Sequence, residues 1–125
     1  MTNEDLMSLA QSAAEKAYAP YSKFNVGAAL LTKTGRVYTG CNVENASFGA
    51  TICAERTAVV KAISNGDKEF QKIAIYTNSG SSAPCGICRQ VLTEFAPEMI
   101  VVYKDNNENL KETELNKLLS DAFLL

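Results

Sequence analysis

Histidine is absent from the 125 residues of this chain, so imidazole is excluded as a metal ligand. Long apolar segments are missing as well, and no run of residues reaches the length of a membrane-spanning helix. The chain opens with Met-Thr-Asn-Glu-Asp, which lacks the basic and apolar regions of a secretory signal. These absences predict a cytoplasmic protein that has no membrane partner.

The chain also lacks a concentration of positive charge. Its 12 Lys and Arg residues are outnumbered by 14 Asp and Glu residues, which gives a formal net charge of −2. The basic residues are scattered, and no basic stripe is arranged to follow a line of phosphates. We therefore expect no nucleic-acid partner and a small molecule as the substrate.

The composition is that of an ordinary globular domain. Hydrophobic residues make up 46% of the chain and charged residues 21%, and 125 residues suffice for one hydrophobic core but not for two. Residues 1–125 are therefore expected to form a single domain. Four cysteines without an export signal indicate reduced thiols rather than disulfides.

Hydrophobic periodicity and turn residues predict an α/β fold. The expected elements are a helix over residues 3–18, a hairpin of strands over residues 25–32 and 36–43, a helix from residue 53 to about residue 65, a strand over residues 73–77, a helix over residues 85–95, a strand over residues 99–103 and a short helix over residues 113–119. The hairpin is antiparallel, whereas helical crossovers join the later strands. This order predicts a three-layer α/β/α sandwich with a mixed central sheet.

Three cysteines predict a zinc site with one open position. Cys85 and Cys88 form a C-x-x-C pair after Pro84, and Cys53 lies in the first turn of the preceding expected helix. Helix N-termini favour the thiolate form of cysteine, which is the form that binds metal. Three ligands leave one tetrahedral position free, as in catalytic rather than structural zinc sites. We expect one Zn²⁺ per chain at this site, with Glu55 beside it as the general base.

Other interpretations of these residues remain open. A C-x-x-C pair alone also occurs in dithiol oxidoreductases, and with a fourth ligand it forms structural zinc sites. Cys41 is the one remaining cysteine and more closely fits a small buried hydrophobic residue. Arg56 is either an ordinary surface cation or a donor to the zinc-bound sulfurs, where it would offset the negative charge of three thiolates.

Polar residues follow the second strand of the hairpin. Asn42 and Glu44 fall on the same strand face, which suits a pair of sugar hydroxyls, although such residues often only form turns. Phe24 and Phe123 are core aromatics by default, and composition alone gives them no other role.

Five segments carry a resemblance to the small homotetrameric cytidine deaminases, and it extends over nearly the whole chain. These segments are Ala19-Pro20-Tyr21-Ser22-Lys23-Phe24, Val26-Gly27-Ala28-Ala29, Gly40-Cys41-Asn42-Val43-Glu44-Asn45-Ala46, Cys53-Ala54-Glu55-Arg56-Thr57-Ala58 and Pro84-Cys85-Gly86-Ile87-Cys88-Arg89-Gln90. The resemblance implies hydrolytic deamination of cytidine and 2′-deoxycytidine to the uridine products and ammonia, as in pyrimidine salvage. It implies zinc binding by the three cysteines and proton transfer by Glu55.

The resemblance also implies a set of substrate contacts. Phe24 would pack on the pyrimidine, Asn42 and Glu44 would hold the ribose, and the backbone near Ala54 would contact the base edge. The Ala46 segment and Phe123 would reach the site of a neighbouring subunit in a homotetramer with shared active sites.

One related family and one departure also bear on the substrate. Blasticidin S deaminase resembles the chain in both metal motifs, but its Asn-Val is not followed by Glu-Asn as it is here at Glu44-Asn45. Phe48 stands where relatives often have tyrosine.

Overall fold

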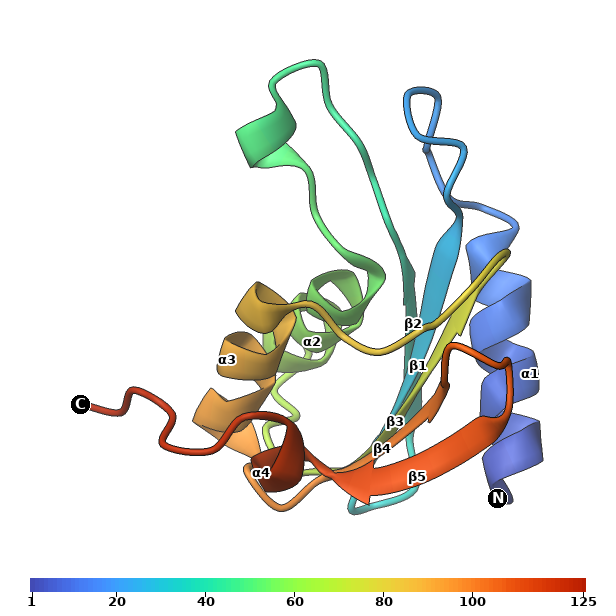
Figure 1. Ribbon diagram of the computed structural model, residues 1–125. Helices are drawn as coiled ribbons and strands as arrows, with labels where there is room; N and C mark the ends of the chain where they lie inside the picture. The colour runs from blue at the N-terminus through green and yellow to red at the C-terminus, as the bar shows by residue number, and fades with distance from the viewer.

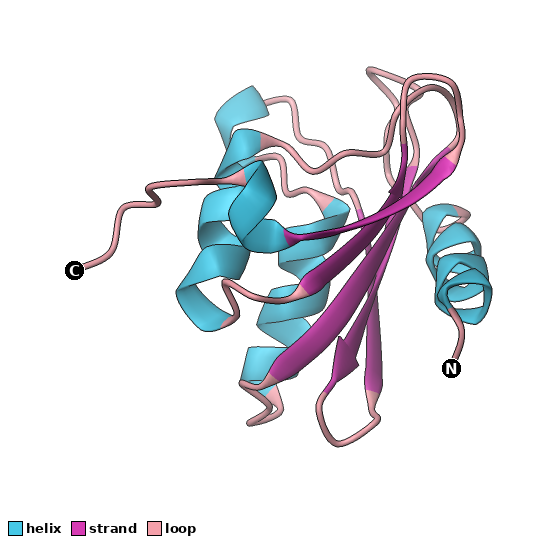
Figure 2. Cartoon of the chain, turned by 60° about the horizontal axis from the view of Figure 1, so that its bottom comes forward, coloured by secondary structure: helices cyan, strands magenta, loops and turns pink.

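A five-stranded mixed sheet divides the molecule into two helical layers (Figure 1, Figure 2). In this computed structural model, which describes residues 1–125, the elements are α1 (Asn3–Ala14), β1 (Val26–Thr32), β2 (Val37–Cys41), the short 3₁₀ helix η1 (Phe48–Ala50), α2 (Ala54–Ser64), β3 (Phe70–Thr77), α3 (Gly86–Phe95), β4 (Ile100–Lys104), β5 (Leu110–Glu114) and α4 (Leu115–Leu118). Helix α1 covers one face of the sheet, and α2, α3 and α4 cover the other. The prediction of a three-layer α/β/α sandwich is confirmed.

The sheet has the strand order β2-β1-β3-β4-β5. Strand β1 is antiparallel to both neighbours, and Ala29 pairs with Thr39 of β2 and with Ala74 of β3. Strands β3 and β4 are parallel, because α3 carries the chain back across the sheet between them. Strand β5 returns antiparallel to β4 and forms one edge.

Two hydrophobic clusters fix the helices to the sheet. The cluster beneath α1 contains Leu6, Met7 and Ala10 with side chains from β1, β3 and β4. The larger cluster lies beneath α2, α3 and α4, and its fully buried members include Leu92 and Leu115. Because both faces of the sheet are covered, the three central strands β1, β3 and β4 have buried apolar residues on both sides.

A glycine in the hairpin brings α2 close to the sheet. At Gly40, a Cβ atom would come within 2.6 Å of both the Ala54 carbonyl oxygen and the Ala58 amide nitrogen. No side chain fits in that space, so the first turns of α2 lie directly on β2. This close packing sets the position of the N-terminus of α2, where Cys53 is the N-cap residue.

The structure corrects several predicted boundaries. Helix α1 ends at Ala14 and not at residue 18, because Tyr18 leaves the helix to bridge Val43, and its N–H bonds to the Asn42 carbonyl at 3.0 Å. The predicted second hairpin strand likewise ends at Cys41 rather than at residue 43.

The prediction was also wrong at the C-terminal edge of the sheet. Strand β5 was not predicted, and residues 113 and 114 belong to it rather than to the final helix. The other strands and the helices α2 and α3 lie within a few residues of their predicted ranges. None of the helices has both the length and the apolar character required to cross a lipid bilayer.

Candidate active site

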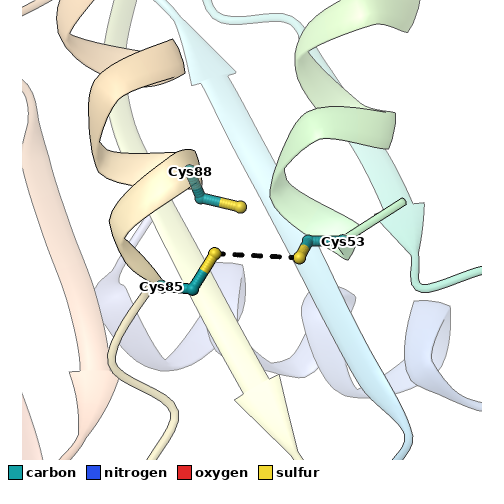
Figure 3. Close-up of side chains that lie close together, drawn as sticks. All are labelled: Cys53, Cys85 and Cys88. Atoms are coloured by element: carbon teal, nitrogen blue, oxygen red, sulfur yellow. Dashed lines mark hydrogen bonds between the residues drawn. The ribbon is translucent and has the colours of Figure 1, made fainter. Parts of the chain in front are cut away.

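Three cysteine sulfurs meet where the N-termini of α2 and α3 converge (Figure 3). Cys53 is the N-cap residue of α2, Cys85 is the N-cap residue of α3, and Cys88 lies in the first turn of α3. All three sulfur atoms lie within 4.8 Å of one another, and those of Cys53 and Cys85 are 3.8 Å apart. Cys53 and Cys85 are 32 residues apart in the sequence, and the fold brings them together.

The sulfur positions fit a tetrahedral metal ion. Zn–S bonds of about 2.3 Å at tetrahedral angles require sulfur atoms about 3.8 Å apart, which is close to the observed spacing. The ligand chemistry also fits, since thiolates are preferred zinc ligands. Cys41 is not a member of the cluster and lines a separate hollow between α1, β2 and α2. The three clustered cysteines therefore suit a zinc site with one position left for a water or a substrate.

The thiols differ sharply in their affinity for protons. A hydrogen bond from Cys88 and, next, one from Arg56 lower the pKa of Cys53 to about 5 despite its partial burial. The same contact with Cys53, together with burial, raises the pKa of Cys88 above its ordinary value. Its contacts with Cys88 and Arg56 therefore favour the thiolate form of Cys53, at the N-terminus of α2.

Arg56 directs its guanidinium group at this charge. Its Nη2 atom lies 3.5 Å from Cys53 Sγ and 3.4 Å from the Thr51 carbonyl oxygen. The hydrogen bond to Cys53 raises the pKa of Arg56, so the guanidinium group stays protonated. Arg89 has a different role, because it donates to the carbonyls of Pro84 at 2.7 Å and Leu118 at 2.8 Å, and so links α3 to α4.

A cavity of about 180 Å³ opens beside the sulfurs. The residues that line it are Phe24, Val26, Asn42, Thr51, Cys53, Glu55, Ile75, Thr77, Ser81, Ser82, Ala83 and Cys85. Glu55 is only 4% exposed, and burial, followed by the negative charge of Cys53, raises the pKa of its carboxyl group. A buried carboxyl with a raised pKa is suited both to accept and to deliver a proton.

Asn42 and Glu44 contact the segment that carries Phe24. Asn42 donates to the Phe24 carbonyl at 2.7 Å and accepts from the Val26 N–H at 2.9 Å. Glu44 Oε1 accepts from the N–H groups of Tyr21 at 3.0 Å and Ser22 at 3.2 Å. Asn42 lines the cavity, whereas Glu44 lies in an adjoining surface groove.

The cavity and this groove share one lining residue. The groove is lined by Tyr21, Ser22, Glu44, Phe48 and Thr51, and Thr51 also lines the cavity. The groove that contains Glu44 therefore lies next to the cavity that contains Glu55.

Besides Glu44, three of the predicted substrate contacts lie outside the cavity of their own chain. Ala54 is fully buried, and its carbonyl oxygen lies against Gly40 of β2. Ala46 is exposed in the segment that leads to η1. Phe123 is 72% exposed on the C-terminal tail, and its carbonyl accepts from Gln90 at 2.8 Å.

Sequence reasoning missed part of the wall of the cavity. Ser81, Ser82 and Ala83 line it immediately before Pro84, and their position next to the cysteine motif is the signal that could have found them. Thr77 at the end of β3 donates its hydroxyl to carbonyls of the following turn, including Ser79 at 3.2 Å. A lone threonine at a strand end has no such signal in the sequence.

Comparison with known proteins gives consistent matches. The family model described as the cytidine and deoxycytidylate deaminase zinc-binding region matches residues 1–104. Cytidine deaminase of Sporosarcina psychrophila is 46% identical over 125 residues, which cover 98% of this chain and 92% of the relative.

Solved structures give the same result. A crystal structure of cytidine deaminase from Burkholderia pseudomallei superposes with a TM-score of 0.92 at 49% identity, covering 98% of this chain and 100% of that one. The cytidine deaminase structure from Mycobacterium tuberculosis gives a TM-score of 0.85 at 41% identity, covering 100% of this chain and 99% of that one.

Proposed function

The chain belongs to the cytidine deaminase family, and from this membership we propose how its own residues carry out the reaction. The protein is an enzyme with cytidine deaminase activity, which replaces the amino group at C4 of the pyrimidine by oxygen and releases ammonia. We extend the substrates to 2′-deoxycytidine. The observation that carries the proposal is one cavity lined by Cys53, Cys85 and the buried Glu55.

The three cysteines would hold the metal, and they fit zinc by both spacing and ligand type. Zinc at such a site supplies a Lewis acid that makes a water molecule a stronger nucleophile at neutral pH. Arg56 then donates to Cys53 and draws electron density from the sulfurs, which strengthens the effect of the metal.

Glu55 is the proton-transfer group of the proposal. It accepts a proton from the attacking water and delivers it to N3 of the ring. It then accepts the proton of the new hydroxyl at C4 and delivers it to the departing amino group. The C–O bond forms before the C–N bond breaks, so water and cytidine give uridine and ammonia without an external oxidant or reductant. The raised pKa of Glu55 supports this role, because one carboxyl must both accept and donate protons.

Phe24, Asn42 and Glu44 form the substrate side of the proposed site. Phe24 packs against the pyrimidine from the cavity wall. Glu44 uses three of the roughly four acceptor positions of its carboxylate within its own chain, which leaves one for a sugar hydroxyl. Asn42 links the segment that carries Glu44 to Phe24 and Val26 at the start of β1.

We infer that the enzyme is a homotetramer with shared active sites. The segments around residues 18–24 and 44–52 project beyond the sheet (Figure 1) and carry exposed apolar side chains, among them Tyr21 and Phe48. Such side chains are typical of surfaces that a second subunit covers. Ala46 and Phe123 would then complete the site of a neighbour.

The test is the absorbance loss on conversion of cytidine to uridine by purified, zinc-loaded protein. The wild-type enzyme is expected to convert cytidine, and Glu55→Gln is expected to bind zinc and nucleoside but to lose at least about 10²–10⁴-fold in kcat. Absence of turnover by the zinc-loaded wild type would refute the function. Substantial turnover by Glu55→Gln would refute the role of Glu55 alone.

A further inference from the structure

Ser22 lies between two of the proposed substrate contacts. Its Oγ atom donates a hydrogen bond to Glu44 Oε2 and accepts one from the backbone N–H of Phe24 at 3.0 Å. One hydroxyl group therefore connects the carboxylate expected at the sugar to the aromatic ring expected at the base.

On the side of Glu44, this hydroxyl sets the orientation of the carboxylate. Oε1 is held by the backbone N–H groups of Tyr21 and Ser22, whereas Oε2 receives its hydrogen bond from the Ser22 hydroxyl. The Ser22 hydroxyl is also the main reason why the pKa of Glu44 lies below its ordinary value. Without it, Oε2 would have no hydrogen-bond donor in the chain, and the orientation of the carboxylate would depend on the two bonds to Oε1 alone.

On the side of Phe24, the hydroxyl closes a strained turn. Lys23 adopts a left-handed backbone conformation with φ of 60°, which is uncommon for a residue with a side chain. The N–H of Phe24 bonds to Ser22 across this turn, while Asn42 holds the Phe24 carbonyl and the Val26 N–H. Loss of the hydroxyl would therefore release the Phe24 amide but leave the start of β1 attached.

We propose that Ser22 is a positioning residue of the deamination site, whose hydroxyl orients the Glu44 carboxylate toward the sugar and the Phe24 ring toward the base. This inference rests on the proposed function, because it takes Glu44 and Phe24 as substrate contacts. Ser22 itself lies in the adjoining groove and does not line the cavity that contains Glu55 and the sulfurs.

The test compares Ser22→Ala with the wild type on cytidine and on 2′,3′-dideoxycytidine, whose sugar has no 2′ or 3′ hydroxyl for Glu44. With cytidine, KM is expected to rise about tenfold, the usual effect of one hydrogen bond to a charged group, while kcat changes less. With the dideoxy substrate the rise should be smaller, because only the effect through Phe24 remains. Ser8→Ala, at an exposed serine of α1, is the control and should match the wild type.

The isosteric pair Ser22→Thr and Ser22→Val separates the hydroxyl from the shape of the side chain. Ser22→Thr should keep a KM for cytidine near that of the wild type, and Ser22→Val should resemble Ser22→Ala. This pair also decides the matter if Ser22→Ala does not fold.

Two results would overturn the proposal while the deaminase function stands. One is an unchanged KM for cytidine in zinc-loaded Ser22→Ala and Ser22→Val. The other is an equal rise with both substrates, which would show that Ser22 does not act through Glu44. An inactive zinc-loaded wild type would overturn the function itself, and this inference with it.

Discussion

Two glutamates near the cavity show how environment assigns different roles to the same side chain. Glu55 is buried next to the charge of Cys53, which raises the pKa of its carboxyl group. Glu44 is held first by the Ser22 hydroxyl and also by backbone N–H groups, which lowers the pKa of its carboxyl group. Glu55 is thereby suited to carry protons, and Glu44 to remain an acceptor for a hydroxyl.

Arg56 gives a prediction at the scale of a single residue. Arg56→Gln should retain zinc but lose about 10- to 100-fold in kcat, the usual effect of removing a group that supports a metal ligand. Because the charge on the sulfurs is then unbalanced, the water activated at the site becomes less acidic. The rising limb of the pH–rate profile should therefore move to higher pH.

The control for this prediction is Arg36→Gln, which removes a guanidinium that is 68% exposed in its side chain and pairs with Asp67 on the surface. Its pH–rate profile should match that of the wild type. An unchanged profile for zinc-loaded Arg56→Gln would mean that the arginine serves packing and not the charge of the cluster.

At the same scale, the sequence points more directly to the cysteine cluster than to the residues that line the cavity. Cys53, Cys85 and Cys88 are recognisable because few residue types bind zinc and their spacing is characteristic. Thr51 and Ser82 have no such chemical signature, and only the folded sheet places them on the cavity wall. The bonds of Asn42 and Glu44 to the segment of Phe24 depend on loop geometry that no periodicity encodes.

At the scale of secondary-structure elements, the position of α2 on β2 depends on Gly40. Gly40→Ala should lower the free energy of unfolding by about 1–3 kcal/mol, because the added methyl meets the backbone of α2. Relief of this contact moves the first turn of α2, which carries Glu55 and follows Cys53. We therefore expect lower kcat and weaker zinc binding, measured below the unfolding temperature of the variant.

Gly27→Ala is the matched variant on the other face of the sheet. An added Cβ there would come within 1.9 Å of the Ala10 carbonyl of α1, so a loss of stability is again expected. Since α1 lies across the sheet from the sulfurs, kcat of the folded enzyme should stay near the wild-type value. Equal losses of kcat in both variants would show that the effect is not specific to α2.

Sequence patterns at this scale failed where tertiary contacts or edge positions decide the structure. Residues 15–18 continue the helical pattern of α1, but the bridge of Tyr18 to Val43 draws them away from the helix. Strand β5 reads Leu-Lys-Glu-Thr-Glu, which has one apolar residue and no strand signal. Charged residues suit an edge strand because they discourage pairing with other chains. The same residues remove the apolar pattern by which β5 could be predicted from the sequence.

At the scale of the whole molecule, the proposed sharing of active sites predicts complementation between inactive chains. Phe123→Ala should weaken cytidine binding, and Glu55→Gln should abolish turnover. Coexpressed tetramers of the two variants should regain activity, up to roughly a quarter of the wild-type value for random mixing, because some sites then receive Glu55 from one chain and Phe123 from another. No recovery in isolated mixed tetramers would contradict the sharing.

The central claim is that Cys53, Cys85 and Cys88 bind one zinc ion that the deaminase reaction requires. Its most direct test is the initial rate of cytidine deamination during titration of metal-free enzyme with zinc. The rate should rise from near zero and reach a plateau at one zinc per chain, and Cys41→Ser should give the same curve. Full activity before zinc is added, or a Cys41→Ser enzyme that cannot bind the metal, would contradict the account.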